Sequence, residues 1–212
     1  MRASTKAGAI ATPEATDRRQ SLIIAARSLI AERGFEGLRL REVAHRVGIN
    51  HATLHHYFPT KEILVECVLS DTVRSLATFR AAQNASAVPA REALRAYLKA
   101  ARVHMCEDPT PFMVLSEFFL RARRDLALAG MLRQLDEGWT AFFISLVKRG
   151  QRDGDFRRDL DAAAVARILT TYLRGVRLPI ADKGTSLARE HAQIQSWIAV
   201  REDSPASRRS RR

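Results

Sequence analysis

Apolar residues recur every three or four positions along nearly the whole chain, and this spacing constrains the fold more than any other feature of the sequence. Leu22, Ala26, Leu29 and Ile30 show it first, and further stripes of the same kind follow as far as residue 200. Such spacing is typical of helices with one buried face, and no segment sustains the apolar–polar alternation of a strand. We therefore predict an all-α protein of about nine helices.

Glycine, proline and capping residues mark the ends of the predicted helices. The first begins at Pro13 or a few residues later and ends at Gly34, and the next three cover about 40–47, 51–58 and 61–82. A joint at 85–89 precedes five more, at about 90–106, 109–124, 126–150, 160–177 and 186–200. The polar segment 149–159 is predicted to be a loop.

The net charge of +12 at pH 7 is spread along the whole chain. Basic surface attracts polyanions and releases their counterions, which favours a nucleic-acid partner, although an arginine-rich proteome would give much of the same charge. No segment has the roughly 20 apolar residues of a membrane span, and the first residues lack the apolar run of a secretory signal. We expect a cytoplasmic protein with no membrane contact.

Cys67 and Cys106 are the two cysteines of the chain, and both stand among apolar residues. Two thiols so far apart favour neither a disulfide framework nor a zinc cluster. We expect both to be core residues, and we expect neither a metal nor a cofactor. An enzyme is disfavoured, because the sequence has no Gly-rich phosphate loop, no HExxH and no Gly-x-Ser-x-Gly motif.

Residues 38–62 hold the pattern that bears most directly on function. One apolar face of a short helix is formed by Leu40, Val43, Ala44 and Val47. Gly48 permits the left-handed backbone of a tight turn, and Asn50 can cap the helix that follows. Two short helices joined in this way predict a helix-turn-helix over about 39–58, in which the second helix enters the DNA major groove.

The second helix of this motif is rich in polar and aromatic side chains. Leu54 and Phe58 supply its apolar contacts, and the positions left facing outward or sideways are His51, Ala52, Thr53, His55, His56 and Tyr57. Such a helix makes a poor core element but suits contacts with bases and phosphates. Two other interpretations stay open: a helical hairpin inside an all-α body, and a metal site on His51 and His55, which would need a third ligand.

Lys61 stands in the first turn of the fourth predicted helix, which Thr60 can cap. A cation at this end opposes the helix macrodipole, so helix stability does not explain it. Free backbone N–H groups at the same end attract anions. We predict that a DNA phosphate binds at Lys61.

A combined pattern runs from about Arg18 to Leu69. Its parts are Ile24-Ala25-Ala26, Leu29-Ile30, Gly34-Phe35-Glu36, Val43-Ala44, Gly48-Ile49, Thr53-Leu54, Tyr57-Phe58-Pro59-Thr60-Lys61-Glu62 and Leu64. This pattern resembles the TetR family of bacterial regulators. The segment 85–200 resembles the family in its helix lengths and in Gly154-Asp155-Phe156 before the penultimate helix.

The resemblance implies which residues contact DNA. They are Arg41 in the second helix, the turn and recognition-helix residues Asn50, His51, Ala52 and Thr53, and the phosphate-binding positions His55, His56, Tyr57 and Lys61. The family usually has glycine where Ala52 stands and tyrosine where His55 stands. We rank Lys61 and Tyr57 as phosphate anchors, and Arg41, His51 and Thr53 as base readers, whereas the role of His55 depends on its protonation.

The resemblance also implies the organisation of the chain. We expect a disordered arm at 1–15, a helix-turn-helix domain at 16–76, a helical effector-binding and dimerisation domain at 77–200, and a disordered basic tail at 201–212. Members of the family are homodimers whose last two helices form a four-helix bundle. Here those helices are 160–177 and 186–200, with the apolar positions Leu160, Ala164, Ile168, Tyr172, Leu187, Ile194, Trp197 and Ile198. The alternative is that these residues pack only on their own subunit.

A small-molecule pocket in the body is implied by the same resemblance. Candidate lining residues are His104, Met105, Phe112, Met113, Phe119, Trp139 and Phe143, each of which can equally be plain core. The leading hypothesis is a homodimeric repressor that a small apolar or amphipathic effector releases from a palindromic operator on double-stranded DNA. The alternatives are a transcriptional activator and an architectural DNA-binding protein of broad specificity.

Overall fold

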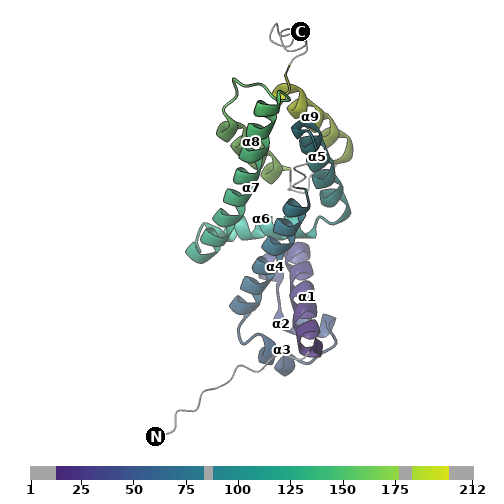
Figure 1. Cartoon of the computed structure of the whole chain (residues 1–212). Helices are drawn as coiled ribbons and strands as arrows, with labels where there is room; N and C mark the ends of the chain where they lie inside the picture. Colours follow the sequence, from purple (N-terminus) through teal and green to yellow (C-terminus); the bar gives the residue numbers. More distant parts are fainter. Residues whose placement is uncertain (1–12, 84–87, 177–182, 201–212) are drawn as a thin grey trace, which may run out of the picture. The chain divides into compact units, whose positions relative to one another are not determined.

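The computed structural model describes residues 13–83, 88–176 and 183–200, and all its regular structure is α-helical (Figure 1). These residues form α1 (Pro13–Gly37), α2 (Leu40–Arg46), α3 (His51–Tyr57), α4 (Lys61–Ala82), α5 (Ala90–Glu107), α6 (Thr110–Ala122), α7 (Leu126–Asp153), α8 (Ala162–Gly175) and α9 (Lys183–Ile198). The predicted all-α fold is therefore confirmed. The predicted N-terminal arm and basic tail lie almost entirely, and the joint at 85–89 in large part, outside the described residues.

The chain divides into two compact units, Met1–Asp71 and Thr72–Arg212, with the division inside α4. In the N-terminal unit, Leu22, Ala26, Leu29 and Ile30 of α1 are fully buried, as their spacing predicts. The helical geometry of α1 breaks at Gly34, whose φ of 65° is left-handed, and a further turn reaches Gly37. The predicted end of the first helix is thus a kink inside the longer element.

Polar contacts join α1 to α4 within the N-terminal unit. Asp71 accepts hydrogen bonds from Gln20 at 3.0 Å and from Arg27 at 3.3 Å. The guanidinium of Arg19 lies 5.0 Å from the centroid of the Phe58 ring and donates to the sulfur of Cys67 at 2.9 Å. These contacts fix α1 against α4 and against Phe58 at the end of α3.

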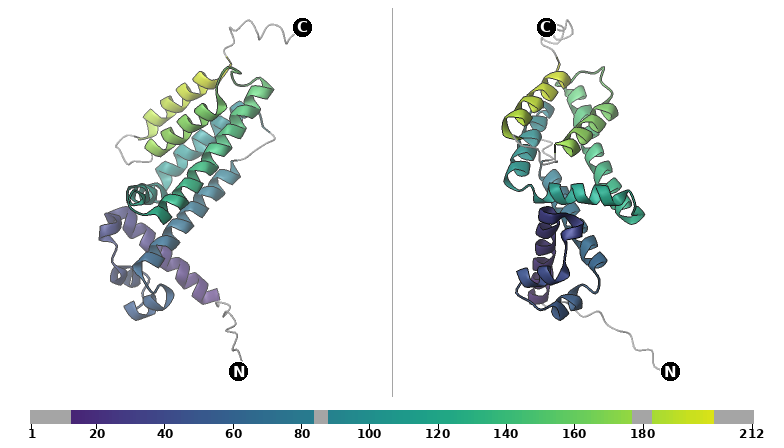
Figure 2. Two further views of the ribbon diagram at one scale, coloured as in Figure 1. Left: turned by 90° about the vertical axis from the view of Figure 1, so that its left-hand side faces the viewer. Right: turned by 180° about the vertical axis from the view of Figure 1, so that it is seen from behind.

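In the C-terminal unit, α7 packs against α5, α6 and α8, and α5 packs against α9. Figure 2 shows the long helices of this unit lying side by side, with α6 placed across them. Aspartates begin two of the helices: the Asp125 carboxylate accepts from the backbone N–H of Ala127 and Leu128, and the Asp161 carboxylate accepts from that of Ala163. None of the described helices is both long and apolar enough to cross a membrane.

Two expectations about the body are wrong. The segment 149–159 is not a loop throughout, because α7 continues to Asp153 and ends at Gly154, whose φ is 82°. The buried ring of Phe156 fills the space beside Gly150, where an added Cβ would lie 2.1 Å from the ring. This packing extends the buried face of α7 by one turn. The second error is the expectation that both cysteines are core residues, because Cys106 is exposed and Cys67 is only half-buried.

Candidate nucleic-acid interface

A tight turn joins α2 to α3 and is built as the sequence predicts. Gly48 has φ 70°, and its N–H donates to the carbonyl of His45 at 3.1 Å. The N–H of Ile49 donates to the carbonyl of Ala44 at 3.0 Å. These two bonds satisfy carbonyls at the end of α2 in a Schellman motif, which needs a residue that tolerates positive φ.

Asn50 caps α3, as predicted. Its side-chain oxygen accepts from the backbone N–H of Thr53 at 2.8 Å and from the Thr53 hydroxyl at 2.9 Å. The cap stabilises the first turn of a helix of only seven residues. The hydroxyl of Thr53, ranked as a base reader, thus donates within the chain and retains its lone pairs for a base donor.

Two apolar side chains hold α3 on its unit. Leu54 and Phe58 are both fully buried, and Arg19 covers the Phe58 ring. The remaining side chains of the helix are exposed at Ala52, His55 and His56, and half-buried at His51, Thr53 and Tyr57. One face of α3 is therefore fixed in the core while the other carries polar and aromatic groups to the surface.

The histidines of α3 lie close together, with the His51 and His55 ring centroids 4.4 Å apart and their planes perpendicular. Nδ1 of His55 lies 3.2 Å from the carbonyl oxygen of Pro59. Since a carbonyl only accepts, Nδ1 carries the proton in this bond.

Lys61 at the start of α4 has a partner within its own unit. Its ammonium donates to the carbonyl of Phe35 at 3.2 Å, so it joins α4 to the end of α1. Thr60 caps α4 as predicted, with its hydroxyl accepting from the N–H of Ile63 at 3.3 Å. An ammonium has three donors, so the bond to Phe35 leaves two for a phosphate.

The arginines of the helix-turn-helix differ in their availability. Arg46 donates twice to Glu32, at 2.9 and 2.7 Å, and Arg33 donates to Glu42 at 2.9 Å. The hydrogen bond from Arg46 lowers the pKa of the Glu32 carboxyl, and Glu32 raises the pKa of Arg46 in return. Arg41 is exposed and has no ion pair with any residue that the structure describes. Its guanidinium is thus available for a base or phosphate.

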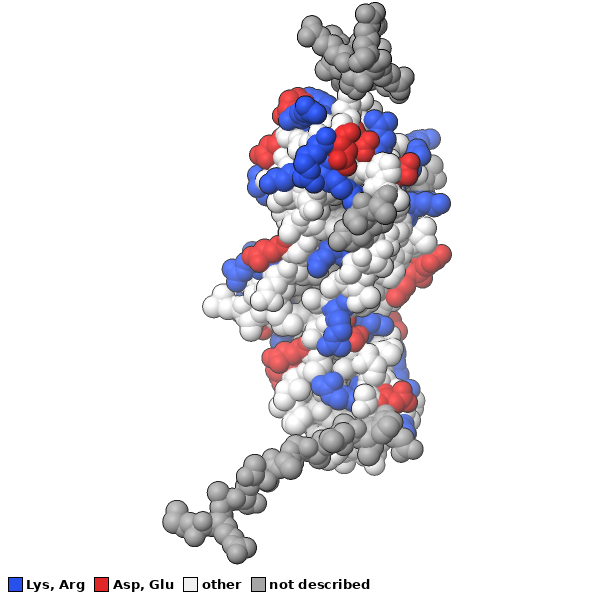
Figure 3. Space-filling model, viewed as in Figure 1, with Lys and Arg blue, Asp and Glu red and all other residues white. Residues whose placement is uncertain are grey.

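Basic and acidic side chains alternate over the face shown in Figure 3 rather than gathering in one basic patch. In the described parts of the chain, no three His, Cys, Asp or Glu side chains are grouped as a metal ion would require.

Five of the seven candidate effector residues lie in one aromatic cluster of the C-terminal unit. Met105, Phe112 and Trp139 line a cavity of about 10 Å³ together with Tyr97. His104 stacks on Phe79 at 5.1 Å and meets the Phe112 ring at 5.3 Å, and Phe143 meets Tyr97 at 5.1 Å. The cavity has room for about one water molecule.

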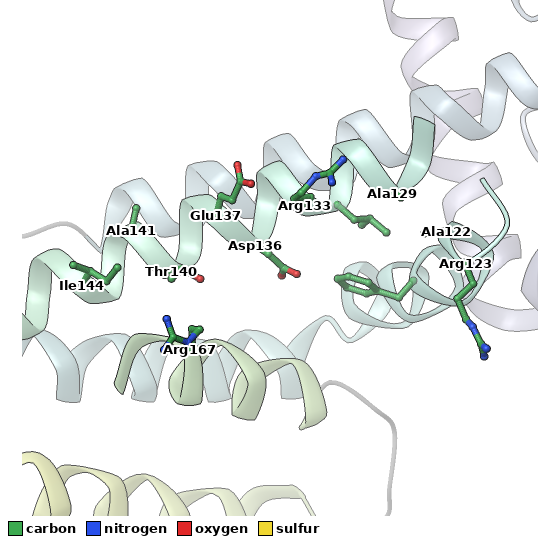
Figure 4. Close-up of a pocket in the computed structure, with 12 residues that line it drawn as sticks. Ala122, Arg123, Ala129, Arg133, Asp136, Glu137, Thr140, Ala141, Ile144 and Arg167 are labelled. Carbon is green, nitrogen blue, oxygen red and sulfur yellow. The ribbon is translucent and has the colours of Figure 1, made fainter. Parts of the chain in front are cut away.

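The other two candidates lie apart from that cavity. Met113 is half-buried and does not line it, and Phe119 lines an open groove of about 610 Å³ between α6, α7 and α8. Figure 4 shows Asp136 and Thr140 of α7 and Arg167 of α8 pointing into this groove. Sequence reasoning missed the groove because residues from three helices form it.

Sequence reasoning also missed Arg80, whose guanidinium lies 5.2 Å from the centroid of the Trp139 ring. The only local signal is a glycine inside a long helix, at Gly138, directly before that tryptophan. Neither residue by itself indicates an arginine from another helix.

Comparison with known proteins gives two matching family models. Residues 22–68 match the model described as bacterial regulatory proteins of the tetR family, and residues 89–200 match the C-terminal domain of BetI-type transcriptional repressors. The HTH-type transcriptional regulator UidR of Escherichia coli K12 is 26% identical over 189 residues, which cover 88% of this chain and 92% of UidR. The HTH-type transcriptional repressor KstR2 of Rhodococcus jostii is 27% identical over 163 residues, which cover 72% of this chain and 74% of KstR2.

Among solved structures, a transcriptional regulator of Saccharomonospora viridis in complex with choline has a TM-score of 0.78. It is 21% identical, and the match covers 88% of this chain and all of that one. This likeness concerns the fold, and it spans both compact units.

Proposed function

The chain belongs to the TetR family of bacterial regulatory proteins, and on that premise we propose that it is a homodimeric repressor which leaves a near-palindromic operator when a small molecule binds. It is a DNA-binding transcriptional regulator of the helix-turn-helix type. The relative named as a repressor, KstR2, supports repression rather than activation. The observation that carries the proposal is α3, which is held by Leu54 and Phe58 and presents its other face to solvent.

DNA contact is proposed for nine residues in two roles. Arg41, Asn50, His51, Ala52 and Thr53 approach base edges or the adjoining backbone, and His55, His56, Tyr57 and Lys61 hold phosphates. The exposed guanidinium of Arg41 and the two donors remaining on Lys61 support these roles. Phosphate contacts set the register on the duplex, while base contacts set the sequence.

Dimerisation is proposed through α8 and α9. Ile168 of α8 is 48% exposed and Trp197 of α9 is 40% exposed, although both are large apolar residues. Between these helices the Tyr172 hydroxyl donates to the Glu190 carboxylate at 2.7 Å, which ties the two surfaces together. Leu187 and Ile198 are buried in their own subunit, so they support the surface from behind.

The dimer is tested by sedimentation equilibrium of the full chain. Ile168→Glu places a charge in the proposed interface and is expected to give a monomer. Leu120→Glu is the matched control, because Leu120 is 66% exposed and lies on α6, outside the proposed interface. A dimer of unchanged stability in Ile168→Glu would contradict the proposed interface.

The operator is tested by selection from random duplexes followed by footprinting. We expect one near-palindromic consensus, with half-site centres about 34–36 Å apart or slightly more. A reporter under that operator should be repressed, and activation would contradict the proposed sign. Binding without a consensus, together with a steep salt dependence, would favour an architectural protein instead.

An effector site is proposed in the aromatic cluster that includes His104, Met105, Phe112, Trp139 and Phe143. The cluster is largely apolar, as ligand pockets are, and the S. viridis neighbour was solved with a small organic molecule. Since the cavity is nearly closed, ligand binding has to move side chains. That movement is the proposed origin of the change in DNA affinity.

A further inference from the structure

The guanidinium of Arg80, on α4, lies over an aromatic ring and has no acidic partner among the residues that the structure describes. It stands 5.2 Å from the centroid of the Trp139 ring. No Asp or Glu in the described residues forms an ion pair with it, whereas Arg174 of the same unit pairs with Asp136. None of its nitrogens is among the buried polar atoms that lack a partner, so this half-buried guanidinium is held by the ring and remains available to an anion.

Gly138 makes room for this guanidinium. A Cβ added at Gly138 would lie 2.5 Å from Nη1 and 3.1 Å from Cζ of Arg80. Glycine is unfavourable inside a helix, and Gly138 stands near the middle of α7. The missing side chain therefore has a structural use, because it leaves space for the guanidinium over the Trp139 ring.

Trp139 supplies a buried, unpaired donor next to this cation. Its side chain is 3% exposed, and its Nε1 has no hydrogen-bond partner in the described structure. Indole Nε1–H only donates, and a buried donor left unpaired destabilises the fold. Arg80 and Trp139 are thus neighbouring donors, and neither can satisfy the other.

Trp139 lines a small cavity with apolar and aromatic walls, and Arg80 reaches this cavity only through its contact with the Trp139 ring. Leu76, Phe79, Tyr97, Met105 and Phe112 line it with Trp139, and no Asp or Glu does. A cationic ligand would find the Trp139 ring already in contact with a cation and no carboxylate on the walls of the cavity. An anionic ligand with an apolar body would find apolar walls, the indole of Trp139 and, 5.2 Å from the centroid of that ring, the guanidinium of Arg80.

We propose that this cavity binds an apolar acid, a ring or chain bearing a carboxylate, and that Arg80 holds the carboxylate. The proposal rests on the effector site proposed above and gives that site its ligand class. Because the cavity has only about 10 Å³, the ligand has to displace side chains to enter. Met105 is suited to such a movement, since its unbranched side chain repacks readily.

The test compares three ligands that share one apolar ring system and differ in charge. The probes are 2-naphthoate, 2-naphthylmethanol and (2-naphthylmethyl)trimethylammonium, titrated calorimetrically into the full-length protein. We expect the wild type to bind 2-naphthoate about tenfold or more tightly than the alcohol, as hydrogen bonds to a charged group suggest. The ammonium probe should bind more weakly than either.

Two variants test the role of Arg80. Arg80→Gln removes the charge and should bring the affinities for the acid and the alcohol within about twofold of each other. Gly138→Ala keeps the charge but pushes the guanidinium from its place, and it should also reduce the preference for the acid. Alanine favours the helix, so this variant tests the proposal even where Arg80→Gln fails to fold. Arg74→Gln, an exposed position on the same helix, should leave the preference unchanged.

Three results would overturn the proposal: tightest binding of the ammonium probe, a preference for the acid that survives in both variants, and no binding of any probe. Operator binding is measured separately, without a probe. A protein that binds its operator but shows no acid preference refutes the ligand class alone. A protein that prefers the acid through Arg80 but binds no operator refutes the proposed repressor alone.

Discussion

Replacing Lys61 by methionine tests the proposed phosphate anchor most directly. The ammonium donates to the Phe35 carbonyl at 3.2 Å and keeps two donors for DNA. Lys61→Met retains most of the side chain's length and loses only the charge and its donors. We expect weaker DNA binding with no change in sequence preference, because a phosphate contact is the same in every sequence.

The size of the effect follows from counterion release. Each phosphate contact contributes about 0.9 to the slope of log affinity against log salt, so a dimer that loses two contacts loses about 1.8 from that slope. Between about 50 and 200 mM salt, the affinity ratio of wild type to variant should therefore shrink about 12-fold. The ratio of operator to random-duplex affinity should stay constant throughout.

The assay is fluorescence anisotropy with operator and random duplexes over that salt range. Lys148→Met is the matched control, since Lys148 is exposed on α7 and its substitution removes the same charge away from the proposed DNA contacts. The lost bond to Phe35 should also cost about 1 kcal/mol of stability, so binding is measured well below the unfolding temperature. An unchanged salt slope in Lys61→Met, or lost discrimination with unchanged random-duplex affinity, would refute the reasoning.

Three further predictions concern histidines. His51→Ala should change the selected consensus more than it changes random-duplex affinity, and an identical consensus for both proteins would contradict base readout at His51. His55→Ala should weaken binding to the operator and to random duplexes about equally, because the proposed contact of His55 is to phosphate. His55→Gln keeps a donor and should retain more of that affinity, and lost sequence preference in His55→Ala would contradict a phosphate contact. Burial lowers the pKa of His191 below 6.5, so protonation of this residue favours the unfolded chain. The free energy of unfolding measured in urea should therefore be level above about pH 7 and fall as the pH drops toward the folded-state pKa. His191→Gln should remove this part of the pH dependence.

Sequence reasoning succeeded where the deciding contacts are local. The turn depends on Gly48 and on carbonyls three to five residues earlier, and the cap of α3 joins Asn50 to Thr53. Burial of Leu54 and Phe58 follows from their spacing along one helix. Each of these features lies within a span that a single sequence displays.

Sequence reasoning failed where the deciding contact joins distant segments. Lys61 pairs with the Phe35 carbonyl, 26 positions away, so the sequence showed a cation without its partner. The pairing of Arg80 with Trp139 joins α4 to α7 and leaves no periodic signal. The error at the end of α7 has a different origin, because Phe156 packs on Gly150 only six positions earlier, and the polar residues between them masked this local contact.

Each of the two proposed sites includes a residue of the same helix, α4. Lys61 belongs to the N-terminal unit and Arg80 to the C-terminal unit, and both are residues of α4. A ligand changes DNA affinity only when it favours one arrangement of the protein over another, and coupling of this kind is typically about 1–3 kcal/mol, or 5–150-fold in affinity. An acid that draws Arg80 away from Trp139 acts on the helix that carries the phosphate anchor. Arg80→Gln should therefore leave operator affinity in the absence of ligand nearly unchanged while reducing the release caused by 2-naphthoate. A variant that loses operator binding without any ligand would instead place Arg80 in the stability of α4 rather than in its coupling to the ligand.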